Sequence, residues 1–540
     1  MFAPGRWLLP LLWLICWTDG ARILIIAPFE GHSQCLLMTP YIQALVDRGH
    51  QLTVIHAFQH CQHSSIGKTT YIRITDNNNV YSEFEEILIQ SLTANKWIEM
   101  NSMTRLMIKV SLNVLHNSEV RQLVHSNTTF DLVVVEPSFT DLLFGLAAQF
   151  NAPLIGLSTC GADWNLNSLV GQSSSMIVEP LMPLGARAVK NLWDRMYNWY
   201  YTTEEWLLMQ LVFLPKLKQV HDHFFGHLER SFLEIRHGFS LMLLNSHFSL
   251  FRARLSVPGM VEVAGLHIPK EDPKLPKDLQ KFIDEAKHGV IYFALGVEMQ
   301  SRDLPKETQK MFLETFMQLP QRVIWKFEGE PPCEVAGNIF LAELLPQQAI
   351  LAHPNVKVFI SHGGMMSTIE AAYYGKPVLG MPVFFDQFRN LELLLEDGAA
   401  LQVSINSLTA KDFMEALDSL INVPSYRENS LAISKRFRDQ PMHPMDVAIY
   451  WTEYIIRYRG ANHLRVCPSH IRLVEYYAVD KFLMVGIRLS LVVVIVFMAL
   501  SKWRCLLAHL VLVAERFWPI YIVISCIVKI CKYLSLKFNF

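Results

Sequence analysis

Two histidines, far apart in the chain, each stand just after a short apolar run. His32 follows the run Arg22–Pro28, and His362 follows Val358–Ile360. Imidazole is the side chain best suited to proton transfer near neutral pH, and open α/β sheets bind ligands at the carboxyl ends of their strands. His32 is therefore either a proton acceptor or an inert histidine of a surface loop, and its position alone leaves both interpretations open.

The turn that contains His362 has the composition of an anion site. Ser361–Gly364 includes two glycines and leads into a helix predicted from about Met366 to Tyr374. The N-terminus of a helix offers unpaired backbone N–H groups and a positive dipole end, so we expect a phosphate group here. Ser367 and Glu370 also fit the S-x-x-E capping box, in which they would only close the start of the helix. The sequence leaves both roles open for these two residues.

A carboxylate that could orient a catalytic histidine follows another apolar run. The strand predicted over Phe130–Val135 ends in Glu136, and Asp141 lies about one turn further on as the reserve candidate. A histidine base usually works with such a carboxylate, which fixes the ring and stabilises its protonated form. The alternative for Glu136 is a carboxylate at a strand end that simply faces water.

The span from Lys357 to Gln387 closely resembles the signature of the UDP-glycosyltransferases, family 1, in an insect or other invertebrate type. The family pattern runs FI-[ST]-H-G-G, then Ser or Asn and a Glu-Ala on the helix, G-x-P, and P-x-x-x-D-Q. Nearly all of it is present in KVFISHGGMMSTIEAAYYGKPVLGMPVFFDQ. The resemblance implies an α/β protein of GT-B fold, with two Rossmann-like domains facing a cleft and a C-terminal transmembrane anchor.

The resemblance also implies roles for individual residues. In the family, a histidine at the place of His32 takes the proton of the acceptor, and vertebrate members carry Asp where this chain has Glu136. The implied reaction is the inverting transfer of a hexose, with UDP-glucose as the expected donor, to a hydroxyl of a small lipophilic acceptor. His362 and Ser367 would lie at the diphosphate, Glu370 at the ribose, and Asp386 with Gln387 at the sugar. The whole expected UDP-sugar site comprises Gly296, Leu344, Gln347, His362, Gly364, Ser367, Glu370, Asp386 and Gln387.

Three positions depart from the family pattern. Ala294 replaces a common Ser, Val297 replaces a hydroxyl that meets the diphosphate, and Leu344 replaces a Trp that stacks on uracil. Stacking and charge-assisted contacts of this kind are typically worth about 1–3 kcal/mol each. The alternative function is therefore a membrane-tethered binding protein on a glycosyltransferase scaffold, with weakened or lost catalysis.

Apolar runs and chain breakers predict the elements that must position these residues. Arg22–Pro28, a helical stretch to Gly49, and Leu52–Ile55 form a β-α-β unit that lacks the G-x-G-x-x-G fingerprint of dinucleotide-binding dehydrogenases. The charged, proline-rich residues 269–276 indicate a linker. We expect a signal peptide over 1–20, an N-terminal acceptor-binding domain over 21–268, a linker over 269–288, a C-terminal UDP-sugar-binding domain with closing helices over 289–465, a transmembrane helix over 482–500, and a tail over 501–540 with a second apolar segment.

Length, charge and motif content exclude several other classes. The chain has 540 residues, 51% of them hydrophobic, and a formal net charge of −1. It is too long for a single core, and this charge provides no basis for nucleic-acid binding. No D-x-D motif occurs, and the loop cluster His56, His60, Cys61 and His63 lacks further ligands. We therefore expect no metal and no cofactor besides the donor substrate, and a homo-oligomer stays open.

The two ends of the chain indicate the secretory pathway. Arg6 and the apolar run Trp7–Trp17 form a signal-peptide pattern, and Asn127 begins an N-x-T sequon. Phe482–Leu500 is long enough to span a bilayer, and the basic residues after it place the tail in the cytosol. We expect a single-pass type I protein of the endoplasmic reticulum membrane with luminal catalytic domains. Residues 506–531 are either an in-plane helix or a second span. Five cysteines would share the luminal side, with their pairing unassigned: Cys35, Cys61, Cys160, Cys333 and Cys467.

Overall fold

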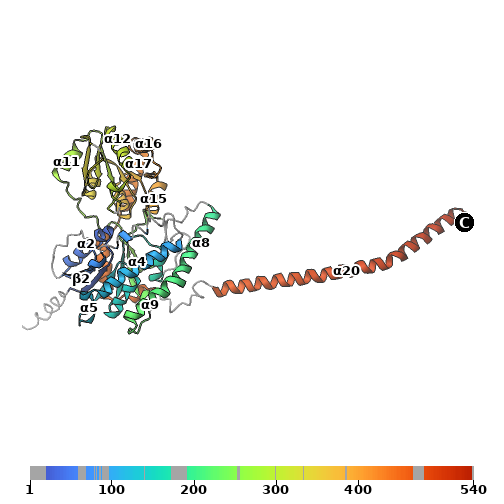
Figure 1. Cartoon of the computed structure of the whole chain (residues 1–540). Helices are drawn as coiled ribbons and strands as arrows, with labels where there is room; N and C mark the ends of the chain where they lie inside the picture. Colours follow the sequence, from blue (N-terminus) through green and yellow to red (C-terminus); the bar gives the residue numbers. More distant parts are fainter. Residues whose placement is uncertain are drawn as a thin grey trace, which may run out of the picture. The chain divides into compact units, whose positions relative to one another are not determined.

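The computed structural model contains two compact units, Met1–Val466 and Cys467–Phe540 (Figure 1). The structure describes residues 20–58, 69–77, 80, 82–83, 87, 96–138, 140–171, 191–251, 256–297, 299–332, 334–383, 386–465 and 479–537.

The first unit contains a seven-stranded parallel sheet in the order β3-β2-β1-β4-β5-β6-β7. Strand β1 pairs with β2 on one side and with β4 on the other, and Ile23–Ala27 is buried throughout. Burial on both faces explains why this strand is continuously apolar in the sequence. The strands are β1 (Arg22–Ala27), β2 (Gln51–His56), β3 (Thr69–Arg73), β4 (Leu132–Val135), β5 (Leu154–Ser158), β6 (Phe239–Leu244) and β7 (Met260–Glu262).

Described helices lie in most of the connections between these strands, as is usual for parallel pairing. The first of them begins at His32 itself, with Gly31 as its N-cap residue, so the predicted loop is one residue shorter than expected. The helices are α2 (His32–Asp47), α4 (Lys96–His116), α5 (Ser118–His125), α6 (Gly145–Gln149), α7 (Trp164–Leu169), α8 (Leu192–Leu208), α9 (Leu214–Phe225) and α10 (Phe232–Arg236).

A second parallel sheet follows, with six strands in the order β10-β9-β8-β11-β12-β13. Its strands are β8 (Val290–Ala294), β9 (Arg322–Lys326), β10 (Ile339–Ala342), β11 (Val356–Ser361), β12 (Val378–Gly380) and β13 (Ala400–Gln402). Its helices are α11 (Lys277–Asp284), α12 (Lys306–Met317), α13 (Gln347–Ala352), α14 (Met365–Tyr374), α15 (Gln387–Glu396), α16 (Ala410–Asn422) and α17 (Pro424–Arg438). Two parallel α/β sheets confirm the predicted fold class.

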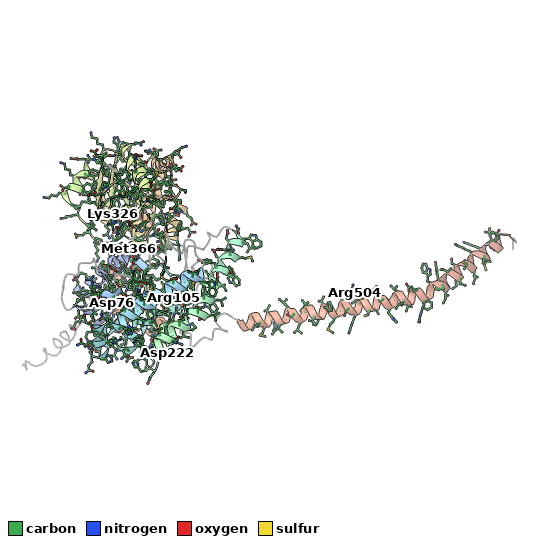
Figure 2. All side chains as sticks on the ribbon, in the orientation of Figure 1. Asp76, Arg105, Asp222, Lys326, Met366 and Arg504 are labelled. Carbon is green, nitrogen blue, oxygen red and sulfur yellow. The ribbon has the colours of Figure 1, made fainter. Side chains whose placement is uncertain are left out.

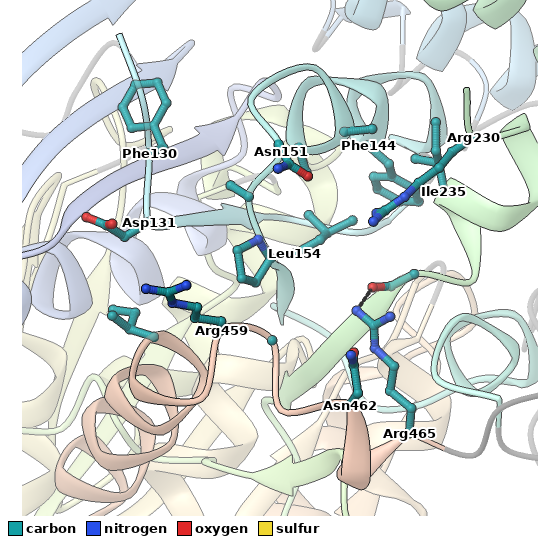
Figure 3. Close-up of a pocket in the computed structure, with 17 residues that line it drawn as sticks. Phe130, Asp131, Phe144, Asn151, Leu154, Arg230, Ile235, Arg459, Asn462 and Arg465 are labelled. Carbon is teal, nitrogen blue, oxygen red and sulfur yellow. Dashed lines mark hydrogen bonds between the residues drawn. The ribbon is translucent and has the colours of Figure 1, made fainter. Parts of the chain in front are cut away.

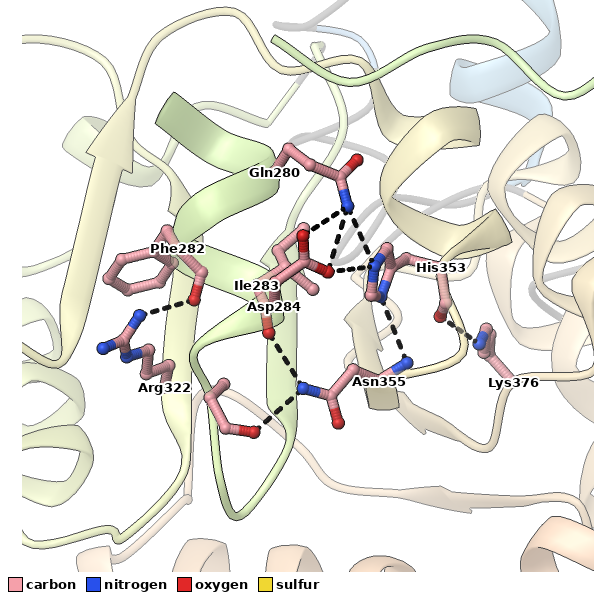
Figure 4. A network of polar contacts seen from close by, with 9 residues as sticks. Gln280, Phe282, Ile283, Asp284, Arg322, His353, Asn355 and Lys376 are labelled. Carbon is pink, nitrogen blue, oxygen red and sulfur yellow. Dashed lines mark hydrogen bonds and ion pairs between the residues drawn. The ribbon is translucent and has the colours of Figure 1, made fainter. Parts of the chain in front are cut away.

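A polar network fixes the amino-terminal edge of this second sheet (Figure 4). His353 Nε2 lies 3.0 Å from Asp284 Oδ1, and the Asn355 side-chain amide donates to the carbonyls of Ile283 and Ala286. Lys376 donates to the carbonyl of His353 at 2.8 Å. These bonds tie α11 to the strand β11, whose opposite end carries His362.

The last helix of the unit, α18 (Pro444–Arg457), returns to the first sheet. Tyr41 in α2 shares a 2.7 Å hydrogen bond with Thr452, and Arg48 pairs with Glu453 at 2.8 Å. The two sheets are therefore also joined by this returning segment, which packs into the core of the first.

The second unit contains one long helix, α20 (Val479–Lys537). Its segment Leu483–Tyr533 is long and apolar enough to cross a membrane by length and composition, and the most apolar 18 residues within it have a mean hydropathy of 2.7. The sequence predicted two apolar segments separated near Leu500, and the structure instead joins them. Residues 501–505 contain neither Gly nor Pro, so nothing in the local sequence ends the helix there.

Candidate functional site

His362 sits between two glycines that leave room for its ring. It follows β11 and precedes α14, and its side chain is buried. A Cβ at Gly296 would lie 2.7 Å from His362 Cε1, and one at Gly364 would lie 2.3 Å from His362 Nε2. Gly296 also has φ +93°, which disfavours any side chain. The space that holds the imidazole therefore depends on both glycines.

Burial keeps the His362 ring neutral at physiological pH. Burial, together with the smaller effect of the nearby Lys326 cation, lowers the pKa of His362 to about 4. Lys326 ends β9 and is labelled in Figure 2. The Nδ1 atom of His362 is buried without a hydrogen-bond partner among the described residues. Because buried polar atoms are rarely left unpaired, this ring is suited to meet a group that is not part of the protein.

Glu370 is held by three side chains from two different segments. Its carboxylate accepts hydrogen bonds from Gln347 at 2.6 Å, from Gln348 at 2.9 Å, and lies 3.2 Å from His267 Nε2. Gln347 also donates to Ser367 Oγ at 3.1 Å. A carboxylate has about four acceptor positions, so three donors leave one for a ligand hydroxyl.

The capping-box interpretation of Ser367 and Glu370 is wrong. The helix α14 starts at Met365 with Gly364 as its N-cap, and no side chain caps it. Ser367 lies inside the first turn rather than before it. The capping box needs its Ser at the N-cap position, and here a glycine occupies that position.

Sequence analysis missed two members of this cluster, His267 and Gln348. Gln348 is adjacent to the predicted Gln347, and the signal for it was the Gln-Gln pair at the start of α13. His267 lies 103 residues before Glu370. Only the folded chain brings it there, because it follows β7 at the exit from the first sheet.

Asp386 and Gln387 stand at the start of α15 and are linked to the glycine turn. Asn390 donates to Asp386 Oδ2 at 2.9 Å and to the carbonyl of Gly363 at 3.1 Å. Burial raises the pKa of the Asp386 carboxyl. Gln387 accepts a hydrogen bond from the backbone N–H of Val383 at 2.8 Å. The structure thus gathers the residues expected at the donor around one turn.

His32 and Glu136 stand at adjacent strand ends. The Glu136 N–H donates to the carbonyl of Ile26 at 3.0 Å, which continues the β1–β4 pairing up to the start of both loops. The Glu136 carboxylate accepts bonds from the Ser138 hydroxyl at 2.7 Å and the Ser138 N–H at 3.1 Å. Burial raises the pKa of Glu136 to about 7, although these hydrogen bonds oppose the shift. Its proton is therefore exchanged close to physiological pH.

Asp141, the reserve carboxylate, has a different partner. Its Oδ1 accepts a hydrogen bond from Arg236 Nε at 2.6 Å, and both side chains are buried. Arg236 also donates to Asn165. Such a pair joins η2 (Asp141–Phe144) to α10, so the contact of Asp141 with Arg236 is a structural one.

Comparisons with known proteins agree with this arrangement. The family described as "UDP-glucoronosyl and UDP-glucosyl transferase" matches residues 21–516. The chain belongs to the UDP-glycosyltransferase family. UDP-glucosyltransferase 2 of Dactylopius coccus is 32% identical over 477 residues, covering 86% of this chain and 90% of that protein. UDP-glucuronosyltransferase 2B13 of Oryctolagus cuniculus is 27% identical over 528 residues, covering 92% and 94%.

Solved structures support the fold of this UDP-glycosyltransferase. The calicheamicin glycosyltransferase CalG4 is similar with a TM-score of 0.56 at 14% identity, covering 82% of this chain and 99% of that one. The glycosyltransferase of kitacinnamycin gives 0.54 at 15% identity, covering 81% and 99%. The predicted GT-B fold and family membership are confirmed, and the chain is an enzyme of the UDP-glycosyltransferase class.

The positions that depart from the family pattern differ in exposure. Ala294 ends β8 and is buried, whereas the Val297 side chain is 39% exposed and that of Leu344 is 87% exposed. Leu344 lies just before α13, whose first residue is Gln347. An 87% exposed leucine has few protein contacts of its own, so its side chain is accessible to a ligand of this UDP-glycosyltransferase.

Other residues predicted from the sequence have separate places. Asn127 is exposed. Cys35 is disulfide-bonded and Cys160 is free, whereas Cys61, Cys333 and Cys467 lie outside the described residues. Within the described part of the chain, no group of three or more His, Cys, Asp or Glu side chains is arranged to hold a metal ion.

A cavity of about 510 Å³ lies away from these residues (Figure 3). Its walls include Asp131 and Leu154, at the amino-terminal ends of β4 and β5, together with Arg459 and Arg465. His32 and Glu136 follow the carboxyl ends of β1 and β4. The cavity is thus at the opposite edge of the first sheet from the predicted proton acceptor.

Proposed function

We propose that this UDP-glycosyltransferase transfers a hexose, glucose in the first place, from a UDP-sugar to a hydroxyl of a small lipophilic acceptor. The observation that carries the proposal is the neutral, glycine-bounded His362 next to the Glu370 cluster. A relative named UDP-glucosyltransferase 2 supports glucose as the sugar. The lipophilic acceptor is inferred from the apolar composition of the first domain.

The donor is proposed to bind at the start of α14. The backbone N–H groups at Gly364–Ser367 and the positive end of α14 would meet the diphosphate. His362 would add a hydrogen bond without adding charge. The remaining acceptor position of Glu370 would take a ribose hydroxyl, and Asp386 with Gln387 would bind hydroxyls of the sugar.

His32 is proposed as the base. Its imidazole takes the proton of the acceptor hydroxyl while the oxygen forms a bond to the anomeric carbon. The bond from that carbon to the diphosphate oxygen breaks, and UDP leaves with the electron pair. The anomeric centre inverts because the acceptor oxygen attacks the face opposite the diphosphate. Glu136 would stabilise the protonated His32, and this requires Glu136 in its ionised form.

Localisation belongs to the same proposal. The helix α20 would anchor the chain in the endoplasmic reticulum membrane, with the catalytic unit in the lumen. Its 51-residue apolar segment Leu483–Tyr533 is far longer than the roughly 20 residues that one span needs. The segment therefore offers enough length for a span and for further contact with the membrane.

Turnover of UDP-glucose by membranes that contain the full chain tests this function. We expect wild-type membranes to be active with a panel of lipophilic alcohols and phenols, and His32→Ala membranes to lose that activity. His288→Ala is the matched control, because His288 is exposed and belongs to the second sheet's half of the unit. Equal activity of wild type and His32→Ala would remove His32 from the mechanism.

A second candidate function is a binding protein with weakened catalysis, favoured by Val297 and by the exposed Leu344. Titration of the wild-type chain with UDP separates the two functions. Binding in the micromolar range supports the transferase. Undetectable binding at millimolar UDP, together with absent turnover, supports the binding protein.

A further inference from the structure

Helix α8 (Leu192–Leu208) exposes aromatic and aliphatic side chains along one face. Trp193 is 73% exposed, Trp199 57% and Tyr200 62%. Trp193 and Tyr200 are seven residues apart, which is about two helical turns, so they lie on one side of the helix. Trp199 flanks them at the edge of that side, about 100° round the helix from Tyr200. Other exposed members of this face are Leu192, Met196, Trp206 and Leu207, and Leu211 continues it beyond the helix. We call these eight residues the α8 aromatic face.

The opposite side of the same helix is buried and partly polar. Asn198, Thr202 and Glu205 are almost fully buried, although all three are polar. Glu205 accepts a hydrogen bond from Trp164 Nε1 at 3.0 Å, and Thr202 donates to the carbonyl of Asn198 at 2.8 Å. A helix on the surface of a water-soluble unit normally shows the reverse pattern, with apolar residues inward. In α8, three of the five buried residues are polar, while most of the large exposed side chains are apolar or aromatic.

Acidic groups beside this face are already engaged within the protein. Asp194 accepts a hydrogen bond from the Asn191 N–H in a capping box, and Glu204 accepts one from Trp97 Nε1 at 3.0 Å. Trp97 and Ile98 of α4 are themselves 50% and 56% exposed, so they add to the apolar surface near α8. Contiguous exposed apolar surface of this kind marks a contact with a membrane or another molecule.

We propose that the α8 aromatic face lies in the interfacial layer of a phospholipid bilayer. Trp and Tyr are suited to this layer because their rings are apolar while an N–H or O–H reaches polar headgroups. The chain also carries the membrane-spanning candidate Leu483–Tyr533, which would keep α8 at high local concentration next to a bilayer. A contact that is weak on its own then becomes persistent.

This inference depends on the proposed membrane anchor and is independent of the transferase chemistry. It gives the first unit its own membrane contact, made by a helix that does not span the bilayer. An interfacial helix of this kind would bring the unit to the layer where lipophilic acceptors are most concentrated.

Photocrosslinking of the full chain in phosphatidylcholine nanodiscs tests the contact. A benzophenone amino acid replaces Tyr200 in one sample and Phe248 in the other. Phe248 is 65% exposed and is not in α8, so it matches Tyr200 in exposure. We expect phosphatidylcholine adducts, detected as a mass shift of the tryptic peptide, in several-fold higher yield at position 200 than at position 248.

A second variant checks that the face as a whole is responsible. Trp193→Glu with Trp199→Glu places charges at exposed positions, so the thermal midpoint in detergent should be unchanged while the lipid adducts at position 200 decrease several-fold. Adducts to a second copy of the chain at position 200 would overturn the lipid assignment in favour of a dimer contact. Equal or absent lipid adducts at the two positions would also overturn it. UDP-glucose turnover is measured in the same samples, so a failed transferase assignment remains distinguishable.

Discussion

Replacing Glu370 by Gln tests the donor site with little change in side-chain volume. In the wild type, the carboxylate accepts from Gln347 and Gln348 and lies 3.2 Å from His267 Nε2. The amide of Gln keeps one acceptor oxygen and turns an NH₂ group toward neighbours that are themselves donors. The substitution therefore affects both the cluster and the proposed ribose contact.

The size of both effects follows from the hydrogen bonds that are lost. Each buried donor that loses its acceptor costs about 1–3 kcal/mol, so the thermal midpoint of Glu370→Gln should fall. A hydrogen bond from a ribose hydroxyl to a carboxylate is worth about 1.5–3 kcal/mol. Its loss weakens UDP binding by roughly 10- to 150-fold.

Calorimetric titration with UDP and with 2′,3′-dideoxy-UDP separates the ribose contact from a general defect. We expect the wild type to bind UDP much more tightly than the dideoxy analogue, and Glu370→Gln to bind the two nearly equally. Glu415→Gln is the matched control, because Glu415 lies on the exposed face of α16. If Glu370→Gln kept the wild-type preference for UDP, the assignment of Glu370 to the ribose would be refuted.

Three further predictions concern other parts of the unit. Burial raises the pKa of Glu136 to about 7, so its protonated form stabilises the fold below about pH 4.5, and this contribution is lost as pH rises to about 7. The thermal midpoint of wild type minus that of Glu136→Gln should therefore fall over that pH range. A constant difference would contradict the raised pKa. The same group makes activity rise with pH through about 7 in the wild type, and Glu136→Gln should lose this rise along with most of its turnover. The φ of Gly364 is −60°, which suits Ala, but the new Cβ of Gly364→Ala would lie 2.3 Å from His362 Nε2 and displace the ring. We therefore expect this variant to bind UDP about tenfold or more weakly, measured by titration. Unchanged affinity would show that the position of the His362 ring is unimportant for UDP binding. Arg236→Met should lower the free energy of unfolding by about 3–5 kcal/mol, because it leaves the buried Asp141 carboxylate unpaired. Thermal unfolding measures this loss. Adding Asp141→Asn should restore part of it.

Local features of the site could be predicted well from the sequence. The strand, the Gly-Gly turn and the helix around His362 were predicted, the strand to within two residues and the helix to within one, because each depends on short apolar runs and on nearby glycines. The family motif added the assignments of Glu370, Asp386 and Gln387, which remain proposals as ligand contacts. The capping-box alternative failed because Ser367 has the right spacing to Glu370 but the N-cap is Gly364, three residues earlier.

Long-range partners could not be predicted. The sequence offered Asp141 as the reserve for Glu136, and only the structure shows that Arg236, 95 residues further on, contacts Asp141. In the same way, α8 is rich in both aromatic and polar residues, and its sequence does not state which side will face the core. Burial of Glu205 against Trp164 decides this, and that contact joins residues 41 positions apart.

By itself, the sequence determined the parallel α/β architecture, the family, the apolar C-terminal segment and the residues at strand ends, since all of these depend on local periodicity and on motifs of fixed spacing. Only the tertiary structure decided that His267 reaches Glu370, that two glycines enclose His362, that Asp141 belongs to Arg236, and that α8 turns its aromatic side outward. The physical reason is that these features are contacts between segments brought together by folding, and the energy of such contacts does not appear in any short stretch of the chain.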